Sequence, residues 1–293
     1  MSGELVALSS ALIWALSSVL MAMGVKRLDV LPMNLVRCVI STIFFWALLP
    51  FFGGLAALAQ IPSQAWLWLV LSVLGLLVVG DTMYFRSLDL AGVSWAMPVA
   101  SINPLWSVLM AGFFLGEPLS WSLLVGAVLV IAGIAVLSRH GGKADPARPV
   151  DGPTRRKGLL LALATSVAWA VGLISLKLAS VEVHSVVVNS IRQPLGAGML
   201  LALTLARGRW RDLRHVDRRS WGIIGLASLL GTGVGSLLFV VAIQMVGAGR
   251  TSVLTSASPL LAVPFSMLLL NEQPNRWTFV GIALTTAGII LVA

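Results

Sequence analysis

The chain has 293 residues, of which 58% are hydrophobic and only 11% are charged. A soluble domain carries about 25% charged residues, so this composition excludes an ordinary soluble protein, a disordered chain and a fibrous one. The formal net charge of +9 is typical of nucleic-acid-binding proteins, but here the basic residues lie in gaps between long apolar segments. This distribution favours a membrane protein with the lipid bilayer, and no nucleic acid, as its partner.

Ten apolar segments are long enough to cross the hydrocarbon core of a bilayer, which takes about 20 helical residues. Because they are continuously apolar rather than alternating, they predict helices and not the strands of a barrel. In chain order they cover about residues 5–24, 34–52, 66–85, 93–114, 120–138, 158–179, 185–206, 220–241, 248–270 and 276–293. The first is expected to be a span rather than a signal peptide, because no basic residue precedes it. The predicted fold class is an all-α membrane protein with ten transmembrane helices.

The sequence repeats itself with an offset of 155 residues. Rare residues coincide in this register, among them the pairs Trp14 and Trp169, Asn34 and Asn189, Arg37 and Arg192, and Trp66 and Trp221. The predicted organisation is a first five-helix repeat at 4–138, a basic linker loop at 139–157 and a second five-helix repeat at 158–293. Because five is an odd number, the second repeat must be inverted across the membrane relative to the first. Inverted repeats are typical of secondary transporters.

The loops on the two sides of the predicted bundle differ strongly in charge. Loops 139–157 and 207–219 hold most of the basic residues, and the loops on the opposite side hold few. Positively charged loops stay in the cytoplasm, so both termini are predicted to lie outside. We expect a multi-pass protein of the cell membrane (plasma or inner membrane), present as a monomer or a homodimer.

Each half contains the same succession of motifs. A tryptophan lies in the first span ("SSALIWALSSVL", "ATSVAWAVGLIS"), a basic residue opens the second ("NLVRCVIS", "NSIRQPLG"), and prolines interrupt the fourth. Small residues recur in the fifth ("VGAVLVIAGIAVLS", "VGIALTTAGIILVA"). In their order and repetition these motifs resemble the EamA-type transporters of the drug/metabolite transporter superfamily. The resemblance implies solute transport by alternating access, often export of metabolites or amino acids, through a cavity lined by spans 1, 3, 4, 6, 8 and 9. It also implies cytoplasmic termini, which the charge distribution contradicts.

Charged residues within the spans are the candidates for chemistry, because a charge in lipid is costly. Arg37 in the second span and Asp81 in the third lie at the same expected depth. They are expected to form an ion pair that locks the two spans together. The functional alternatives are that Asp81 takes up a proton or that the pair acts as a gate. In the second half Arg192 matches Arg37, but Ser236 stands where the first half has Asp81. The symmetry is therefore broken at this position.

Arg192 lacks an acidic partner in its own half. It is expected either to pair with Glu117 across the two halves or, together with Lys177, to attract an anionic group of the solute. Glu272 is in turn placed to pair with Arg37. Both glutamates directly follow the fourth span of their half, and a role in the turn is favoured for them.

Polar and aromatic residues within or near the spans are candidates for lining a central cavity, since a buried indole N–H needs a hydrogen-bond partner. These cavity candidates are Trp14, Trp169, Asn34, Asn189, Tyr84, Asn103, Gln193 and Gln244. Prolines within a helix remove a hydrogen bond and produce a kink, which serves either gating or a static shape. The predicted kinks lie at Pro98, Pro104, Pro259 and Pro264. The matched glycines of the fifth spans are expected to pack within the bundle or between protomers.

No pattern in the sequence indicates catalysis. The "GTGVGS" string lies inside an apolar span with no strand before it, so it is not a phosphate loop. The histidines are scattered and Cys38 is the single cysteine, so neither a metal site, a cofactor nor an internal disulfide is expected. The predicted function is a secondary transporter for a small metabolite, driven by a proton gradient or by exchange. The alternatives are an uncoupled facilitator or channel and, less favoured, a membrane-embedded enzyme.

Overall fold

The structure is a computed structural model that describes residues 2–24, 29–140, 152–270 and 275–293. Within these ranges the chain is almost entirely helical and contains no strand. Nine helical segments in the described part are long and apolar enough to cross a membrane, and α15 (Arg276–Val292) adds a tenth apolar helix of 17 residues. The predicted all-α fold class is confirmed.

The helices follow the order of the predicted spans. In the first half they are α1 (Gly3–Gly24), α2 (Val30–Leu48), η1 (Leu49–Phe52), α3 (Gly54–Ala59), α4 (Ser63–Val73), η2 (Leu74–Val78), α5 (Val79–Ala91), α6 (Val93–Ala100), α7 (Asn103–Leu115) and α8 (Trp121–His140). In the second half they are α9 (Gly152–Ala179), α10 (Ser185–Ala206), η3 (Arg209–His215), α11 (Arg218–Ser228), η4 (Leu229–Gly235), α12 (Ser236–Val246), α13 (Ala248–Thr255), α14 (Ser258–Leu270) and α15. The elements η2 and η4 are π-helical turns, and they interrupt the third span of each half at matching positions.

The helix ends differ from the predicted span limits at several places. The third span runs from Ser63 to Ala91 rather than over 66–85, because helix formation continues past the apolar segment into polar residues at both ends. The sixth span begins at Gly152, within the predicted linker 139–157. Hydropathy marks the part of a helix that lies in lipid, whereas backbone hydrogen bonds extend the helix into the polar layer beyond it.

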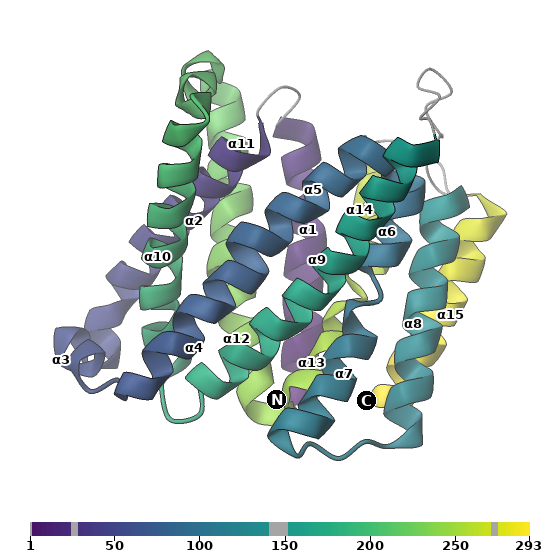
Figure 1. The fold of residues 1–293 in the computed structure, drawn as a ribbon, viewed down its shortest axis with the longest axis horizontal. Helices are drawn as coiled ribbons and strands as arrows, with labels where there is room; N and C mark the ends of the chain where they lie inside the picture. Colours follow the sequence, from purple (N-terminus) through teal and green to yellow (C-terminus); the bar gives the residue numbers. More distant parts are fainter. Residues whose placement is uncertain (1, 25–28, 141–151, 271–274) are drawn as a thin grey trace.

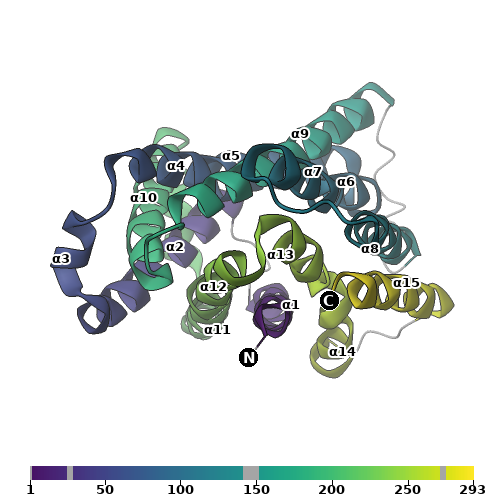
Figure 2. The ribbon, with the colours of Figure 1, turned by 90° about the horizontal axis from the view of Figure 1, so that it is seen from below.

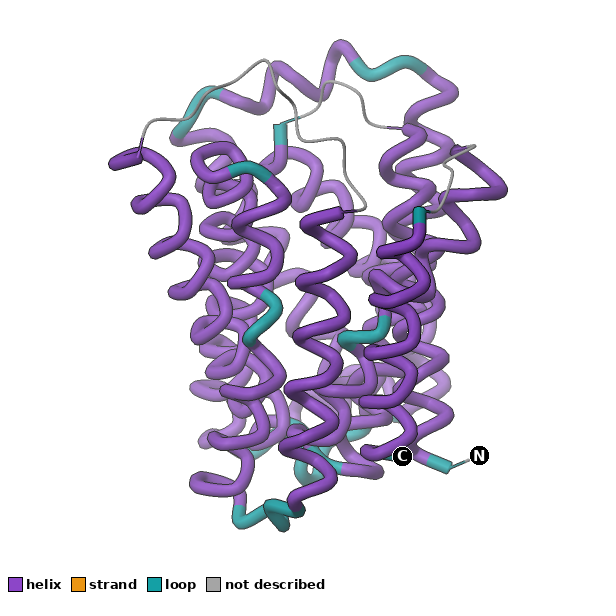
Figure 3. Tube along the Cα trace, turned by 90° about the vertical axis from the view of Figure 1, so that its right-hand side faces the viewer, coloured by secondary structure: helices purple, strands orange, loops and turns teal. Residues whose placement is uncertain are grey.

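The two halves run through the bundle in opposite directions. Figure 1 shows α1 leaving the end of the molecule at which both termini lie, whereas α9 runs toward that end. Figure 3 shows the N-terminus and the C-terminus together at this end. The inverted arrangement of the repeats, which the odd number of spans predicts, is therefore present in the structure.

The main helix contacts join one half to the other. Helix α2 packs along α10, α8 along α15, and α9 along α4 and α5, as Figure 2 shows from below. Helix α1 likewise packs against α11 and α12. The first span of each half thus lies against the third span of the other, so the two halves interleave and share one interior.

The pair formed by α8 and α15 depends on matched glycines. A Cβ atom at Gly133 would lie 2.7 Å from the carbonyl oxygen of Gly281, and one at Gly288 would lie 2.6 Å from that of Gly126. Such distances leave no room for a side chain, because real Cβ atoms essentially never approach closer than 3.0 Å. The glycines of the fifth spans therefore pack within the bundle, where they let two helix backbones meet.

We expect Gly288→Ala to lower the free energy of unfolding by about 1–3 kcal/mol, the usual cost of overpacking a close contact. Gly198→Ala is the matched control, because a Cβ atom at this helical glycine meets nothing within 4 Å. Thermal unfolding of the two purified variants in detergent would measure the difference. Equal melting temperatures would contradict the role of the glycine contact.

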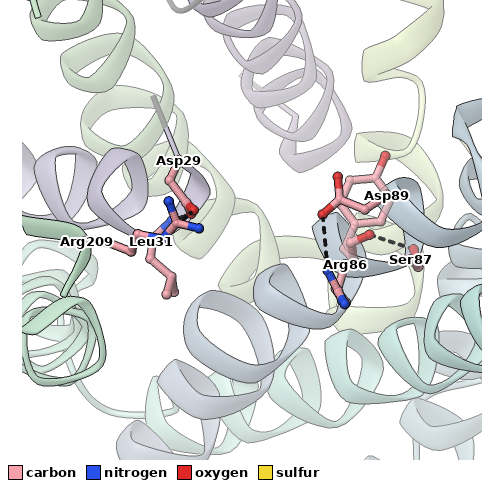
Figure 4. Close-up of polar contacts among 7 residues, drawn as sticks. Asp29, Leu31, Arg86, Ser87, Asp89 and Arg209 are labelled. Carbon is pink, nitrogen blue, oxygen red and sulfur yellow. Dashed lines mark hydrogen bonds and ion pairs between the residues drawn. The ribbon is translucent and has the colours of Figure 1, made fainter. Parts of the chain in front are cut away.

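Ion pairs form between surface residues at the end of the molecule opposite the termini. Asp29 caps α2 by accepting a hydrogen bond from the N–H of Leu31 at 3.2 Å, and it pairs with Arg209 at 3.4 Å. Arg86 and Asp89 form a second pair at 3.9 Å (Figure 4). Exposed pairs of this kind contribute little to stability. They also neutralise only part of the positive charge at this end, which the charge rule predicts to be cytoplasmic.

Candidate functional site

The fourth span of each half is broken in the middle of the bundle. Helix α6 ends at Ala100 and α7 begins at Asn103, while α13 ends at Thr255 and α14 begins at Ser258. The two breaks occupy positions that match in the repeat, and a proline is the second residue of the helix that follows each break. A proline lacks the N–H of a helical hydrogen bond, and its ring clashes with the carbonyl group four residues earlier. That residue is the last one of α6 and of α13, so these sequences stop one helix and start the next.

The breaks correct part of the prediction for the prolines. Pro104 and Pro259 occupy the first turn of α7 and α14, where the missing N–H costs no hydrogen bond. They begin half-helices instead of kinking a continuous one. Pro98 and Pro264 do lie inside helices, α6 and α14.

A cavity of about 180 Å³ lies beside the two breaks and between the halves. Its lining includes Tyr84, Ser101, Asn103, Ile134, Trp169 and Ser256. Tyr84, Asn103 and Trp169 are cavity candidates from the sequence, whereas the two serines are not. A signal for the serines is present in the sequence, since a serine stands three residues before a proline in both halves, in "SINP" and "SASP".

Trp169 is fixed in this cavity by contacts with α5. Its Nε1–H donates a hydrogen bond to Oδ1 of Asp81 at 3.2 Å, and its ring lies 5.0 Å from the ring of Tyr84. Gly80 makes this approach possible, because a Cβ atom there would lie 2.7 Å from Nε1 of Trp169. The indole therefore stands between the cavity and the Asp81 carboxylate.

Trp14, the partner of Trp169 in the repeat, lies outside the cavity. Its Nε1–H donates to the carbonyl oxygen of Gly231 at 2.9 Å, and its ring lies 4.9 Å from that of Phe239. Phe239 is 8% exposed and Ser252 is 2% exposed. They match Tyr84 and Met97, which line the cavity and are partly exposed, so the corresponding region of the other half is closed at these two positions.

The spans that line the cavity consequently differ from those that the resemblance implies. Of spans 1, 3, 4, 6, 8 and 9, the third, fourth, sixth and ninth contribute to the lining. Among the residues described, spans 1 and 8 contribute none, whereas the fifth span contributes Ile134. Trp14 and Phe239 belong to the two missing spans, and they pack against each other instead.

A second cavity, of about 10 Å³, lies near Asp81. Its lining includes Asn34, Arg37, Cys38, Asp81 and Thr232. Nη1 of Arg37 donates to Oδ1 of Asn34 at 2.9 Å, while Nε of Arg37 and Nδ2 of Asn34 are buried without a hydrogen-bond partner.

The predicted direct ion pair between Arg37 and Asp81 is not found. In the described part of the chain, no contact within 4.0 Å joins the two side chains, although both line the second cavity. Arg37 is held instead by Asn34, one helical turn earlier on α2. Glu272, the other predicted partner of Arg37, lies outside the described residues.

The described ranges also hold no group of three or more His, Cys, Asp or Glu that could bind a metal ion.

Arg192 lies within a polar cluster of the helices and does not line either cavity. Its Nε donates to Oγ of Ser72 at 3.0 Å, and its Nη1 donates to Oδ1 of Asn189 at 3.3 Å. Ser236 also donates to Oδ1 of Asn189, at 3.1 Å. Gln193 is buried beside this cluster and donates to the carbonyl oxygen of Thr232 at 3.4 Å. These contacts satisfy Arg192 with neutral groups, and the predicted pair with Glu117 is absent.

Two further candidates stabilise helix ends at the end of the molecule where the termini lie. Glu117 accepts hydrogen bonds from the N–H groups of Ala248 (2.7 Å) and Gly249 (3.0 Å), which open α13. Lys177 donates to the carbonyl oxygen of Ile243 in the last turn of α12, at 2.8 Å. These positions match the helix dipole, which favours an anion at the N-terminus and a cation at the C-terminus.

Gln244 has a similar structural role. Its Nε2 donates to the carbonyl oxygens of Ser180 and Val183, both at 2.8 Å, and so fixes the turn between α9 and α10. Neither Gln244 nor Lys177 lines the cavity. Their contacts all cross between elements that are distant in the sequence, which is why spacing alone did not separate them from cavity residues.

The model of the EamA-like transporter family matches residues 1–139 and 156–293. The chain belongs to this family. The match includes both halves and therefore all the helices that surround the two cavities. The predicted membership is thus confirmed, and the protein is a multi-pass membrane protein of a transporter family.

Relatives of this EamA-like protein carry transporter names. An "Uncharacterized transporter" of Archaeoglobus fulgidus is 27% identical over 98% of this chain and 96% of its own. A "Probable transport protein" of Saccharomyces cerevisiae is 25% identical over 79% of this chain and 68% of its own. A "Probable glucose uptake protein" of Priestia megaterium is 23% identical over 73% of this chain and 72% of its own.

The fold also has a counterpart among solved structures. A protein of known crystal structure that is 21% identical covers 99% of this chain and 95% of its own, with a TM-score of 0.81. At this level of identity the likeness concerns the arrangement of the helices and not the solute.

Proposed function

We propose that this EamA-like protein is a secondary transporter that moves a small neutral or zwitterionic metabolite across the cell membrane by alternating access. The observation that carries the proposal is the cavity between the halves, which is present on one side of an inverted repeat and filled on the other. Tyr84 and Trp169 border the cavity, whereas the matching Phe239 and Trp14 close the corresponding region.

Inversion gives this difference a functional meaning. If the two halves exchange conformations, the cavity beside Tyr84 closes and the region beside Phe239 opens toward the other face of the membrane. Two such states have similar energies because they are built from similar sequences. The lining residues Tyr84 and Ile134 lie on α5 and α8, about two turns before these helices end at the basic end of the molecule. We propose export from this side, where the charge rule places the cytoplasm.

The lining indicates the class of solute. Its polar groups are the hydroxyls of Ser101 and Ser256, the amide of Asn103 and the aromatic residues Tyr84 and Trp169, and none of the ten lining residues is charged. Each break also brings the end of one half-helix and the beginning of the next beside the cavity. Carbonyl ends favour an ammonium group and N–H ends favour a carboxylate, which suits the zwitterion of an amino acid.

D-Glucose is a second candidate solute. The relative of Priestia megaterium is named a probable glucose uptake protein, and hydroxyl and aromatic groups of the kind that line this cavity also bind sugars. Both candidates call for a transporter and not an enzyme.

The test is counterflow into proteoliposomes that contain the purified protein. Vesicles are preloaded with unlabelled L-alanine, L-threonine, L-phenylalanine or D-glucose, and uptake of the same labelled solute is followed, with protein-free vesicles as the control. Saturable uptake that internal solute accelerates is expected for at least one amino acid. Uptake of D-glucose and of none of the amino acids would identify the sugar as the solute. Linear uptake without acceleration would indicate a channel, and no uptake of any of the four would overturn the proposed solute class.

A further inference from the structure

We infer that Asp81 binds a proton whose presence is transmitted to the solute cavity by Trp169, so that protonation and solute binding are linked. The inference rests on the proposed function and names the groups that would couple transport to a proton gradient. It starts from the position of a single side chain, because Trp169 both lines the solute cavity and donates a hydrogen bond to Asp81.

The indole forms the connection between the two cavities. On one side its ring lies 5.0 Å from Tyr84 and borders the 180 Å³ cavity. On the other side its Nε1–H lies 3.2 Å from Oδ1 of Asp81, which lines the 10 Å³ cavity together with Arg37. A solute that contacts the ring therefore acts on the hydrogen bond to the carboxylate, and the state of the carboxylate acts on the ring.

The second half of the molecule argues against a merely structural role for this bond. Trp14 occupies the matching position, rests on the matching glycine, Gly235, and satisfies its N–H with the backbone oxygen of Gly231. The position that matches Asp81 is Ser236, which donates to Asn189 instead. Packing alone thus requires only a backbone acceptor for the indole, and the first half has a titratable acceptor in its place.

The surroundings of Asp81 leave its charge free to change. The charged and titratable groups near it are Arg37 and Cys38 on α2 and Tyr84 on α5. Helix α6 has no charged residue, and the charged residues of α9 lie at its ends, two or more turns from Trp169. Because Arg37 makes no direct ion pair with Asp81, adding a proton to the carboxylate breaks no salt bridge.

The small cavity has room for one water molecule beside Asp81. A volume of about 10 Å³ is close to what one water molecule needs, and a buried water requires polar partners. The unpartnered Nε of Arg37, the unpartnered Nδ2 of Asn34 and the Asp81 carboxylate are such partners. A water molecule at this point would join Arg37 to Asp81 without a direct contact.

Protonation changes the bond to Trp169 in a definite direction. A carboxylate accepts a stronger hydrogen bond than a neutral carboxyl group, so the protonated Asp81 holds the indole less firmly. The ring is then freer to move within the cavity. By linkage, a solute that needs the indole in its present position weakens proton binding by the same factor as the proton weakens solute binding. We expect this factor to be about fivefold or more.

The first test needs no solute. The protein is labelled with 5-fluorotryptophan, and the ¹⁹F signals of Trp169 and Trp14 are assigned from Trp169→Phe and Trp14→Phe. From about pH 4 to about pH 9 the Trp169 signal is expected to shift, and the shift should vanish in Asp81→Asn. The Trp14 signal is the internal control and should stay constant, because its acceptor does not titrate. A pH-independent Trp169 signal would overturn the inference, as would a shift that persists in Asp81→Asn.

The fold of the variant is monitored in the same spectrum. An unchanged Trp14 signal in Asp81→Asn shows that the bundle is intact. If this variant does not fold, Asp81→Glu keeps a titrating group at a different distance from the indole and is expected to show a smaller shift with a changed midpoint. A shift identical to that of the wild type in Asp81→Glu would contradict the assignment to this side chain.

A transport measurement separates the inference from the proposed function. With L-alanine, L-threonine, L-phenylalanine or D-glucose, the wild type should concentrate the transported solute under a pH gradient, whereas Asp81→Asn should retain counterflow but not concentrate it. If the wild type shows counterflow but does not concentrate the solute under the pH gradient, proton coupling is overturned. The proposed function as a transporter is then still supported. Absence of counterflow would overturn the proposed solute class, while the ¹⁹F titration still decides whether Asp81 and Trp169 are linked.

Discussion

Replacing Phe239 with alanine is expected to shift the protein toward the access state opposite to the one described here. Phe239 packs on Trp14 and fills the region that matches the cavity. In the opposite state it would line a cavity, as Tyr84 does here, and would lose most of this packing. Removing a buried phenylalanine costs about 3–5 kcal/mol, and this cost falls mainly on the present state. At about 1.4 kcal/mol per factor of ten, the ratio of the two states should change by at least about a hundredfold.

Cysteine labelling would measure this shift. In a Cys38→Ala background, Ser252→Cys places a thiol at a position that is 2% exposed here and that matches the partly exposed cavity residue Met97. In sealed vesicles with the termini outward, a membrane-impermeant maleimide should label this thiol much faster when Phe239→Ala is added. Phe279→Ala is the matched control, because Phe279 is 61% exposed on α15. Equal labelling with and without Phe239→Ala would contradict the assignment of Phe239 to a closed side.

Ser256→Leu is expected to lower transport strongly without unfolding the protein. Ser256 follows α13 at the break and lines the cavity, so a leucine there would occupy the space of the solute. The cost of overpacking, about 1–3 kcal/mol, would fall on the solute-bound state and lower flux roughly ten- to a hundredfold.

Ser266→Leu provides the comparison for this variant. Ser266 lies on α14 and donates a hydrogen bond to the carbonyl oxygen of Val263 in the same helix, away from the cavity lining. Counterflow of the solute identified in proteoliposomes, together with the melting temperature of each variant, would separate blocked transport from lost stability. Wild-type flux in Ser256→Leu would place the solute elsewhere in the protein.

The sequence predicts the helices well because the signal is local. The spans at 185–206 and 248–270 match α10 and the α13–α14 pair at both ends, since polar residues or glycine bound the apolar segments. The inversion of the halves follows from an odd number of spans. Each of these conclusions depends only on the order of residues along one segment or on the count of segments.

The candidate site is predicted less completely because its contacts join distant segments. Glu117 and Lys177 are charges within or beside spans, but only the fold brings them to the ends of α13 and α12. Trp14 and Trp169 are equivalent in the repeat, and nothing in the sequence indicates which one borders a cavity in a given state. The breaks before Pro104 and Pro259 are different, because the matched prolines mark these positions in the sequence, but the prolines begin half-helices instead of kinking a continuous helix.

The interleaving of the two halves also determines when the molecule can acquire its final packing during synthesis. Helix α8 packs along α15, so the two contacting surfaces are about 150 residues apart in order of translation. At 5–20 residues per second, α8 waits in the bilayer for roughly 8–30 s before its partner is made. Helices α2, α4 and α5 likewise wait for α9 and α10. The first five spans must therefore remain inserted in lipid on their own hydrophobicity, and the interior forms late, after most of the chain has left the ribosome.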